Sequence, residues 1–77
     1  MTKVTIYTTP ACVYCKMAKE FFQQNNVSYE EKDVLVDDAA REAMIAKSNQ
    51  LGVPVIDVDG QIIVGFDEAA IKKLLKL

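Results

Sequence analysis

A chain of 77 residues, 51% hydrophobic and 26% charged, has the size and composition of one folded domain, because a core of this size needs most of the chain. Three glycines and two prolines are too few for a disordered segment, and no repeat or linker interrupts the sequence. The net charge of -2 comes from interleaved acidic and basic residues, which excludes a basic stripe for nucleic acid. We therefore expect one domain over residues 1–77 and no nucleic-acid partner.

The start of the chain, from Met1 to Val4, lacks the pattern of a secretion signal, and no apolar run is long enough to cross a membrane. We expect a cytoplasmic protein without a membrane partner. The chain has two cysteines, Cys12 and Cys15, and no histidine. A disulfide between them closes a very short loop and removes little entropy from the unfolded chain. The pair is therefore a poor structural crosslink.

The first half of the chain predicts a strand, a helix and a second strand. Residues 3–8 are rich in β-branched side chains that alternate between two faces, as in a strand. A helix is predicted from Tyr14 to Asn25 or Asn26, and β-formers among charges indicate a second strand over residues 28–35. The apolar face predicted for this helix, at positions i, i+3, i+4 and i+7, consists of Tyr14, Met17, Ala18 and Phe21.

The second half predicts a helix, a hairpin and a last helix. Asp37 or Asp38 can cap a helix that continues to about Ser48. Two β-rich runs, residues 53–58 and 61–64, are separated by a dipeptide that suits a two-residue hairpin turn. The dipeptide at this turn is Asp59-Gly60. Asp67 can cap a last helix, and the apolar face of that helix consists of Ile71, Leu74 and Leu75.

This order, β-α-β-α-β-β-α, predicts an α/β fold with a four-stranded mixed sheet flanked by three helices. The strand-helix-strand unit should place two parallel strands side by side through a right-handed crossover. The hairpin then extends the same sheet with antiparallel strands.

The cysteine pair lies at the predicted junction of the first strand and the first helix. Backbone amides at a helix start have no acceptor within the helix, so a thiolate is stabilised there. Thiols at the start of Cys-x-x-Cys motifs ionise at roughly pH 3.5 to 7.5, against about 8.5 for a free thiol. We therefore expect Cys12 to be the nucleophile. Cys15, one helical turn inward, would resolve a mixed disulfide on Cys12.

Two other readings of the pair remain open. Free cysteines are often ordinary buried residues, although this spacing at a strand-helix junction is much more specific to redox sites. A metal site needs about four soft or imidazole ligands, so the chain cannot complete one alone. Only a dimer that shares ligands could bind a metal.

Four segments resemble a glutaredoxin of the thioredoxin fold: Val4-Thr5-Ile6-Tyr7-Thr8, Cys12-Val13-Tyr14-Cys15-Lys16, Gly52-Val53-Pro54-Val55 and Gly65-Phe66-Asp67. The resemblance covers essentially the whole chain. It implies that Pro54 follows a cis peptide bond and that Val53 offers its backbone to the substrate. It also assigns Cys12 and Cys15 as the redox disulfide.

The chain departs from glutathione-binding glutaredoxins at three places. Val13 replaces a proline, Thr9 replaces a lysine, and residues 64–67 keep only the second glycine and the aspartate of a Gly-Gly-Cys-Asp segment. Without the lysine, one cationic partner for a glutathione carboxylate is missing, although Asp67 and the last helix could still hold the γ-glutamyl end. We expect no bound cofactor and treat glutathione as a candidate co-substrate.

The resemblance extends to two narrower groups. Gly65-Phe66 and the residue after Cys12 resemble donors that feed ribonucleotide reductase and are reduced by thioredoxin reductase. Lys16-Met17-Ala18 and Val55-Ile56-Asp57 resemble small bacterial glutaredoxin-like proteins.

Several other residues have two readings each. Tyr14 either shapes access to Cys12 or packs in the core, and Lys16 either stabilises the thiolate or is only solvated. Gln50 is a glutathione contact or a loop residue. Phe66 is a docking platform or lies under the last helix, and of these two readings we favour the docking platform. Residues 30, 31 and 33 are acidic, which fits a charged strand edge better than acid-base catalysis.

The sequence thus predicts a glutaredoxin-like thiol-disulfide oxidoreductase that reduces protein or glutathione mixed disulfides. Its partners would be disulfide-containing clients, with glutathione or thioredoxin reductase as electron source, and we expect a monomer. One alternative is a thioredoxin-reductase-fed donor to ribonucleotide reductase or a peroxidase. Others are an iron-sulfur cluster carrier, against which Cys15 argues, and a redox-inert interaction module.

Overall fold

The computed structural model describes residues 3–77 and contains the predicted elements in the predicted order. The strands and helices are β1 (Val4–Thr8), α1 (Val13–Gln24), β2 (Glu30–Asp33), α2 (Asp38–Ser48), β3 (Val55–Val58), β4 (Gln61–Val64) and α3 (Glu68–Leu75). The predicted fold class, an α/β fold with a four-stranded mixed sheet and three helices, is confirmed.

The strands lie in the order β2-β1-β3-β4, so the first strand of the chain is central. β1 pairs in parallel with β2 and antiparallel with β3, and β4 completes the antiparallel hairpin. All five residues of β1 are buried, as expected for a strand with neighbours on both edges and helices on both faces. The parallel pair is joined through α1, because parallel strands need a crossover connection.

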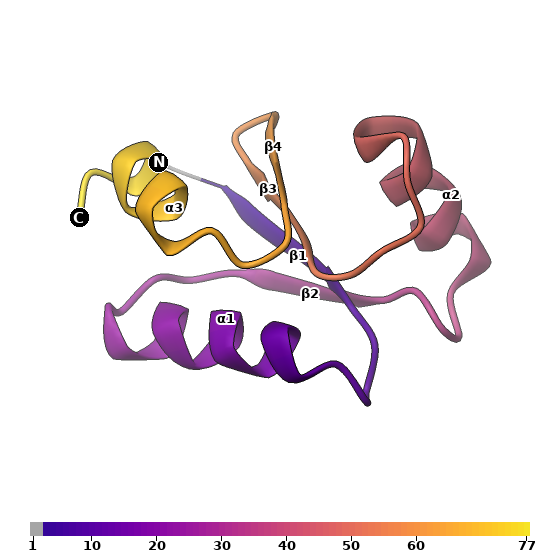
Figure 1. The fold of residues 1–77 in the computed structure, drawn as a ribbon, viewed down its shortest axis with the longest axis horizontal. Coiled ribbons are helices and arrows are strands. Elements are labelled where there is room, and N and C mark those ends of the chain that lie inside the picture. The colour runs from indigo at the N-terminus through magenta and orange to yellow at the C-terminus, as the bar shows by residue number, and fades with distance from the viewer. Residues whose placement is uncertain (1–2) are drawn as a thin grey trace.

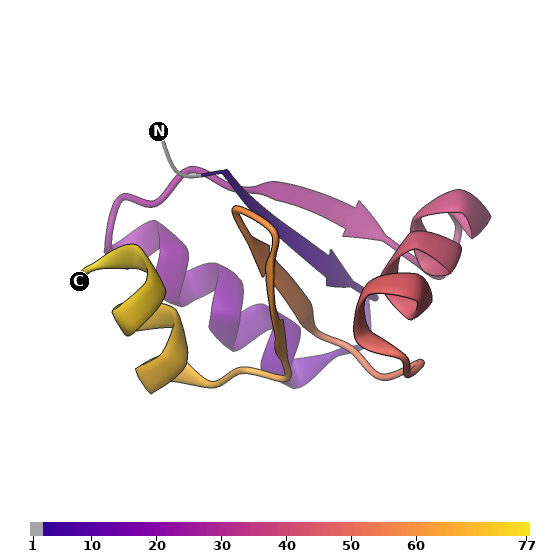
Figure 2. The same ribbon diagram turned by 90° about the horizontal axis from the view of Figure 1, so that it is seen from above.

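Helices α1 and α3 cover one face of the sheet and α2 covers the other (Figures 1 and 2). Two apolar clusters correspond to these two layers. The larger consists of Val4, Ile6, Ala18, Phe21, Phe22, Ile56, Val58, Ile63 and Ile71, and the smaller of Tyr7, Val34, Ala40, Met44 and Val55. Successive residues of a strand point to opposite faces, so β1 contributes Val4 and Ile6 to one cluster and Tyr7 to the other.

Of the four residues predicted for the buried face of α1, Ala18 and Phe21 are buried as predicted, and the other two are not. The buried residues are Cys15, Ala18, Phe21 and Phe22. By contrast, Tyr14 and Met17 are 62% and 43% exposed. Both the predicted and the observed sets fit helical spacing, because Phe21 and Phe22 lie side by side and either can be read as the end of the stripe.

Three predicted strands are longer than the observed ones, β1 by one residue and β2 and β3 by more. β2 ends at Asp33, because Val34 turns into the core while Leu35 and Val36 become exposed. β3 begins at Val55, two residues later than predicted, because a proline nitrogen cannot donate a ladder hydrogen bond.

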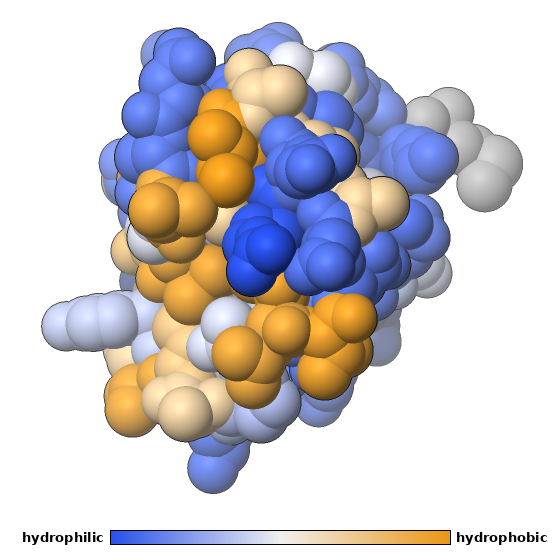
Figure 3. Space-filling model, turned by 90° about the vertical axis from the view of Figure 1, so that its right-hand side faces the viewer, coloured by the Kyte–Doolittle hydropathy of each residue, from blue (hydrophilic) through white to orange (hydrophobic). Residues whose placement is uncertain are grey.

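On the side of the molecule where α2 lies, hydrophobic side chains are exposed beside strongly polar ones (Figure 3).

The predicted turns and caps are confirmed. Asp59 and Gly60 both have positive φ angles, 51° and 90°, as a type I′ hairpin turn requires. Asp37 caps α2 by accepting the amide hydrogen bond of Ala40. The left-handed Asn49 ends that helix, a conformation that asparagine tolerates better than most residues.

Candidate active site

Three segments meet at one edge of the sheet. The loop that follows β1 leads to Cys12, while β3 runs antiparallel to β1 and pairs Val55 with Tyr7. Pro54, just before β3, therefore lies beside the end of β1. The end of β4 reaches the same edge, because the amide of Gly65 donates a 2.8 Å hydrogen bond to the carbonyl oxygen of Pro54. The start of α1, the loop that precedes β3 and the entry to α3 thus lie at the same end of the sheet (Figure 2).

Cys12 is the N-cap residue of α1. Its backbone is extended, and its sulfur accepts a hydrogen bond of 3.1 Å from the amide of Cys15. The Cys12 amide in turn donates to the carbonyl oxygen of Thr9 at 3.3 Å, which holds the loop in place. The Cys12 side chain is partly exposed, so the sulfur is both accessible and bonded to a donor that favours negative charge.

Cys15 has a different environment, since its side chain is fully buried within the first turns of α1. Burial, helped by the neighbouring Cys12 sulfur, raises the pKa of the Cys15 thiol above its ordinary value. A thiol that loses its proton less readily is a weak first nucleophile. The two cysteines of the pair are therefore chemically unequal.

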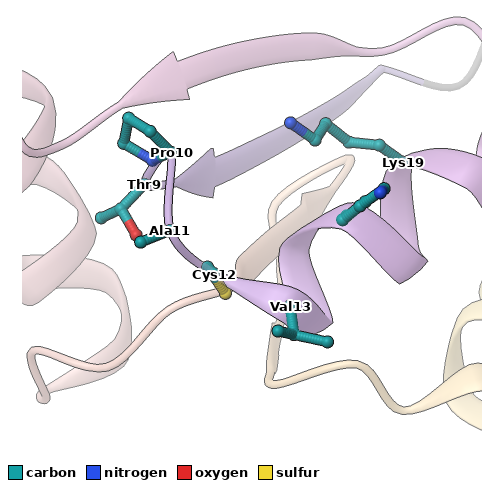
Figure 4. Close-up of a pocket in the computed structure, with 7 residues that line it drawn as sticks. Thr9, Pro10, Ala11, Cys12, Val13 and Lys19 are labelled. Atoms are coloured by element: carbon teal, nitrogen blue, oxygen red, sulfur yellow. The ribbon is translucent and has the colours of Figure 1, made fainter.

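A hollow of about 400 Å³ opens beside Cys12 on the side of the β1–α1 loop. Figure 4 shows this loop leading to Cys12 at the start of α1, with Lys19 further along the same helix. The residues that line the hollow are Thr9, Pro10, Ala11, Cys12, Val13, Lys16 and Lys19. A small group attached to an attacked sulfur has room here.

The peptide bond between Val53 and Pro54 is cis, as the resemblance implied. Pro54 is fully buried and Val53 is half-buried. Gly65 has a φ of 82°, a conformation that side-chain-bearing residues rarely adopt. The backbone geometry of this edge thus explains why a glycine stands at position 65.

Phe66 and Asp67 both have structural roles. The Phe66 ring packs edge-on against Phe21 with 5.9 Å between centroids, and it is half-buried. This contact favours the tucked position over the docking platform. Asp67 caps α3 by accepting a 3.1 Å hydrogen bond from the amide of Ala70. Its carboxylate nevertheless remains exposed.

The other two predicted binding residues, Gln50 and Tyr14, differ in how free their side chains are. The Gln50 side chain both accepts from and donates to the backbone of Gly52, so its amide is used within its own loop. Tyr14 lies on the exposed side of α1, and the prediction that it packs in the core is wrong.

Of the acidic residues, Glu31 pairs with Lys19 and Glu30 with Lys32, which agrees with a charged strand edge.

Lys19 was not singled out from the sequence. Cys12, Lys16 and Lys19 recur at i, i+4 and i+7, which places them on one helical face, so the spacing could have indicated the lining of the hollow. The ion pair with Glu31, which lies on β2, could not be read from the sequence.

Two features are absent from residues 3–77. No cluster of three or more potential metal-ligating side chains occurs there. No helix in the described part of the chain is long and apolar enough to cross a membrane.

The fold and the pair of unequal thiols define the class of the protein, a thiol-disulfide oxidoreductase of the thioredoxin fold. Residues 4–63 match the family model for glutaredoxins, and the chain belongs to the glutaredoxin family.

Curated relatives agree with this assignment. An uncharacterised glutaredoxin-like 8.6 kDa protein encoded in a rubredoxin operon of Clostridium pasteurianum is 45% identical, over 95% of this chain and 97% of the relative. Glutaredoxin 3 of Escherichia coli is 40% identical, over 88% of this chain and 82% of the relative.

Solved structures are similar over nearly the whole chain. The thioredoxin-like protein BC3987 is 37% identical with a TM-score of 0.87, over 92% of this chain and 97% of that one. The NrdH-redoxin of Escherichia coli, a glutaredoxin-like protein with a thioredoxin-like activity profile, is 28% identical. Its TM-score is 0.84, over 94% of this chain and 93% of that one.

Proposed function

We propose that this oxidoreductase reduces disulfides by dithiol exchange, with Cys12 as the nucleophile and Cys15 as the resolving thiol. The supporting observation is the contrast between the two sulfurs. Cys12 is partly exposed and accepts an amide hydrogen bond, whereas Cys15 is fully buried and its thiol pKa is raised. An incoming disulfide can therefore contact Cys12 but not Cys15.

In the first step the Cys12 thiolate attacks one sulfur of the substrate disulfide. A mixed disulfide with Cys12 forms, the substrate S–S bond breaks, and the other substrate sulfur leaves as a thiolate that takes up a proton. In the second step Cys15 gives up its proton and attacks the Cys12 sulfur, which releases the second substrate thiol. The substrate gains two electrons, and the protein is left with a Cys12–Cys15 disulfide.

The proposed substrates are protein disulfides and glutathione mixed disulfides. The backbone of Val53, just before the cis-proline, is available to a peptide-like substrate, because no backbone partner is recorded for it within residues 3–77. The exposed carboxylate of Asp67, at the start of α3, suits an ammonium group such as the one on the γ-glutamyl end of glutathione. Tyr14, Gly65 and Phe66 would complete the surroundings of the substrate.

There are two candidate electron sources, glutathione and thioredoxin reductase. Asp67 favours glutathione. The similarity to NrdH-redoxin, with its thioredoxin-like activity profile, favours thioredoxin reductase instead. Thr9, which stands where glutathione-binding glutaredoxins have a lysine, points the same way. We take glutathione as the first candidate because the Asp67 carboxylate remains free of ion pairs among the described residues.

The experiment measures NADPH consumption with hydroxyethyl disulfide as substrate, in parallel with glutathione plus glutathione reductase and with thioredoxin reductase. Turnover with glutathione supports the first candidate, and turnover only with thioredoxin reductase supports the second. Silence in both arms, or undiminished turnover by Cys12→Ser, contradicts dithiol exchange at this pair.

A further inference from the structure

The hollow beside Cys12 carries positive charge in a protein whose net charge is -2. Among residues 3–77, Lys16 and Lys19 are the only charged residues that line it, and both come from one face of α1. Cys12 lines the same hollow (Figure 4). A substrate group that enters this hollow beside Cys12 meets the side chains of two lysines.

The two lysines differ in how far their charges are compensated. The Lys19 ammonium forms a 3.0 Å ion pair with the carboxylate of Glu31, which fixes its position and offsets much of its charge. This pair also raises the pKa of Lys19, so the group stays cationic at neutral pH. Lys16 is exposed, and no acidic partner is recorded for it in the described part of the chain. Lys16 is therefore the main source of uncompensated charge.

We infer that Lys16, supported by Lys19, selects disulfide substrates that carry a carboxylate a few bonds from the attacked sulfur. This inference rests on the proposed role of Cys12. A lysine ammonium has three donors, so Lys19 can bind a substrate carboxylate while it keeps Glu31. The apolar part of the substrate would lie against Pro10, Ala11 and Val13, which supply most of the remaining lining.

The test is the rate at which the reduced protein is oxidised in a single turnover, which needs no reductase. Two small disulfides are compared, dithiodipropionate with a carboxylate on each arm and the uncharged hydroxyethyl disulfide. The measured quantity is the ratio of their second-order rate constants, because a change in thiolate reactivity cancels in this ratio. A purely structural role of Lys16, or a general effect on Cys12, leaves the ratio unchanged.

We expect Lys16→Gln to lower the ratio about two- to fivefold, as for one partly solvated charge pair. Lys19→Gln should lower it less, because Glu31 already offsets that charge. Lys16→Glu should lower it further and favour the cationic disulfide cystamine. The matched control is Lys73→Gln, the same change on α3 away from the hollow, which should leave the ratio as it is. Added salt should reduce the preference in the unaltered protein.

The outcomes separate this inference from the proposed function. If both disulfides oxidise the protein but Lys16→Gln and Lys73→Gln leave the ratio equally unchanged, carboxylate selection is wrong and dithiol exchange stands. If neither disulfide reacts at Cys12, the proposed function fails and this inference fails with it. The same ratio, measured with glutathione disulfide and with the disulfide of a peptide in which Asp flanks Cys, shows which source of carboxylate the hollow favours.

Discussion

The backbone amide of Cys15 donates a hydrogen bond of 3.1 Å to the sulfur of Cys12. The second cysteine of the pair thus holds the first one at the start of α1, one turn away from the buried thiol. The same sulfur acts as a helix cap and is the exposed reactive group, so a substitution at Cys12 bears on both the helix start and the chemistry.

Replacing each cysteine by serine should separate the two chemical roles. Cys12→Ser should abolish disulfide reduction, whereas the helix should remain capped, because serine is a good N-cap residue. Cys15→Ser should instead accumulate a mixed disulfide between Cys12 and the substrate. Mass spectrometry of the two variants after exposure to a disulfide checks this. A stable adduct on Cys15 in the Cys12→Ser variant would reverse the proposed roles.

Alkylation of the reduced protein should occur in two stages. At neutral pH iodoacetamide should modify Cys12 quickly and Cys15 slowly, because Cys15 is buried and its pKa is raised. Because the pKa of Cys15 is raised, its labelling should increase only at a pH above the range in which an ordinary thiol ionises. Peptide mapping measures both rates, and the chain unfolded in guanidinium chloride provides the control in which the rates converge. Equal rates in the folded protein would contradict the assignment.

The stability of the reduced protein should fall at alkaline pH. A raised pKa in the folded state means that the unfolded chain loses the Cys15 proton first. The stability is therefore full below the unfolded thiol pKa and decreases as the pH rises through the folded one. Urea unfolding at increasing pH measures the decrease. The Cys15→Ala variant should be less stable at neutral pH but should show a shallower decrease, and an equal slope would exclude this thiol as the cause.

Acid should weaken the contact between α2 and the sheet. Lys47, in the last turn of α2, donates hydrogen bonds to Asp57 at 2.8 Å and to the Tyr7 hydroxyl at 2.9 Å. Burial tends to raise the pKa of the Asp57 carboxyl, but hydrogen bonds from Lys47 and Gly60 outweigh it and lower the pKa below 3.8. The stabilisation is present above the unfolded pKa and is lost as the pH falls through the folded one.

The Asp57→Asn variant should therefore lose less stability on acidification than the unaltered protein. Urea unfolding at neutral pH and at pH values below 3.8 measures the difference. The matched control is Asp38→Asn, which removes an exposed carboxylate paired with Arg41. If both variants respond to acid alike, the Lys47–Asp57 pair contributes no specific pH dependence.

Two substitutions at Asp67 separate its cap role from substrate binding. Asp67→Ala should destabilise the protein by about 1 kcal/mol, because the cap of α3 is lost. Asp67→Asn should preserve the cap and the stability, while it raises KM for a glutathione mixed disulfide and leaves that for hydroxyethyl disulfide unchanged. Urea unfolding and steady-state kinetics are the two measurements. An unchanged KM for the glutathione substrate in Asp67→Asn would remove Asp67 from the site.

Ile71 should carry most of the attachment of α3, because it is the buried residue of that helix and is fully enclosed. Ile71→Val should cost about 0.5–1.5 kcal/mol and Ile71→Ala about 2–5 kcal/mol of unfolding free energy. Lys73→Ala, on the exposed side of α3, is the control and should change little. A loss at Ile71 no larger than at Lys73 would show that α3 is held by other contacts.

The order of elements, the caps at Asp37 and Asp67 and the hairpin turn could be predicted from the sequence, because these features depend on neighbours a few residues apart. The reactive pair was also evident, because its spacing and its position after a strand are local. The orientation of α1 was not, since two adjacent phenylalanines allow two apolar faces. Only packing against the sheet decided that Phe22 is fully buried and that Tyr14 is exposed.

Sequence alone therefore determined what lies along the chain, namely the strands, the helices and the two thiols. The tertiary structure decided which residues far apart in the sequence come into contact and which side chains are buried. Strand register brings Pro54 and Gly65 to the end of β1, and burial makes the Cys15 thiol unlike the Cys12 thiol. The pairing of Lys19 with Glu31 belongs to this second kind, because it joins residues on α1 and β2. Contacts of this kind depend on how whole elements pack, which local patterns do not specify.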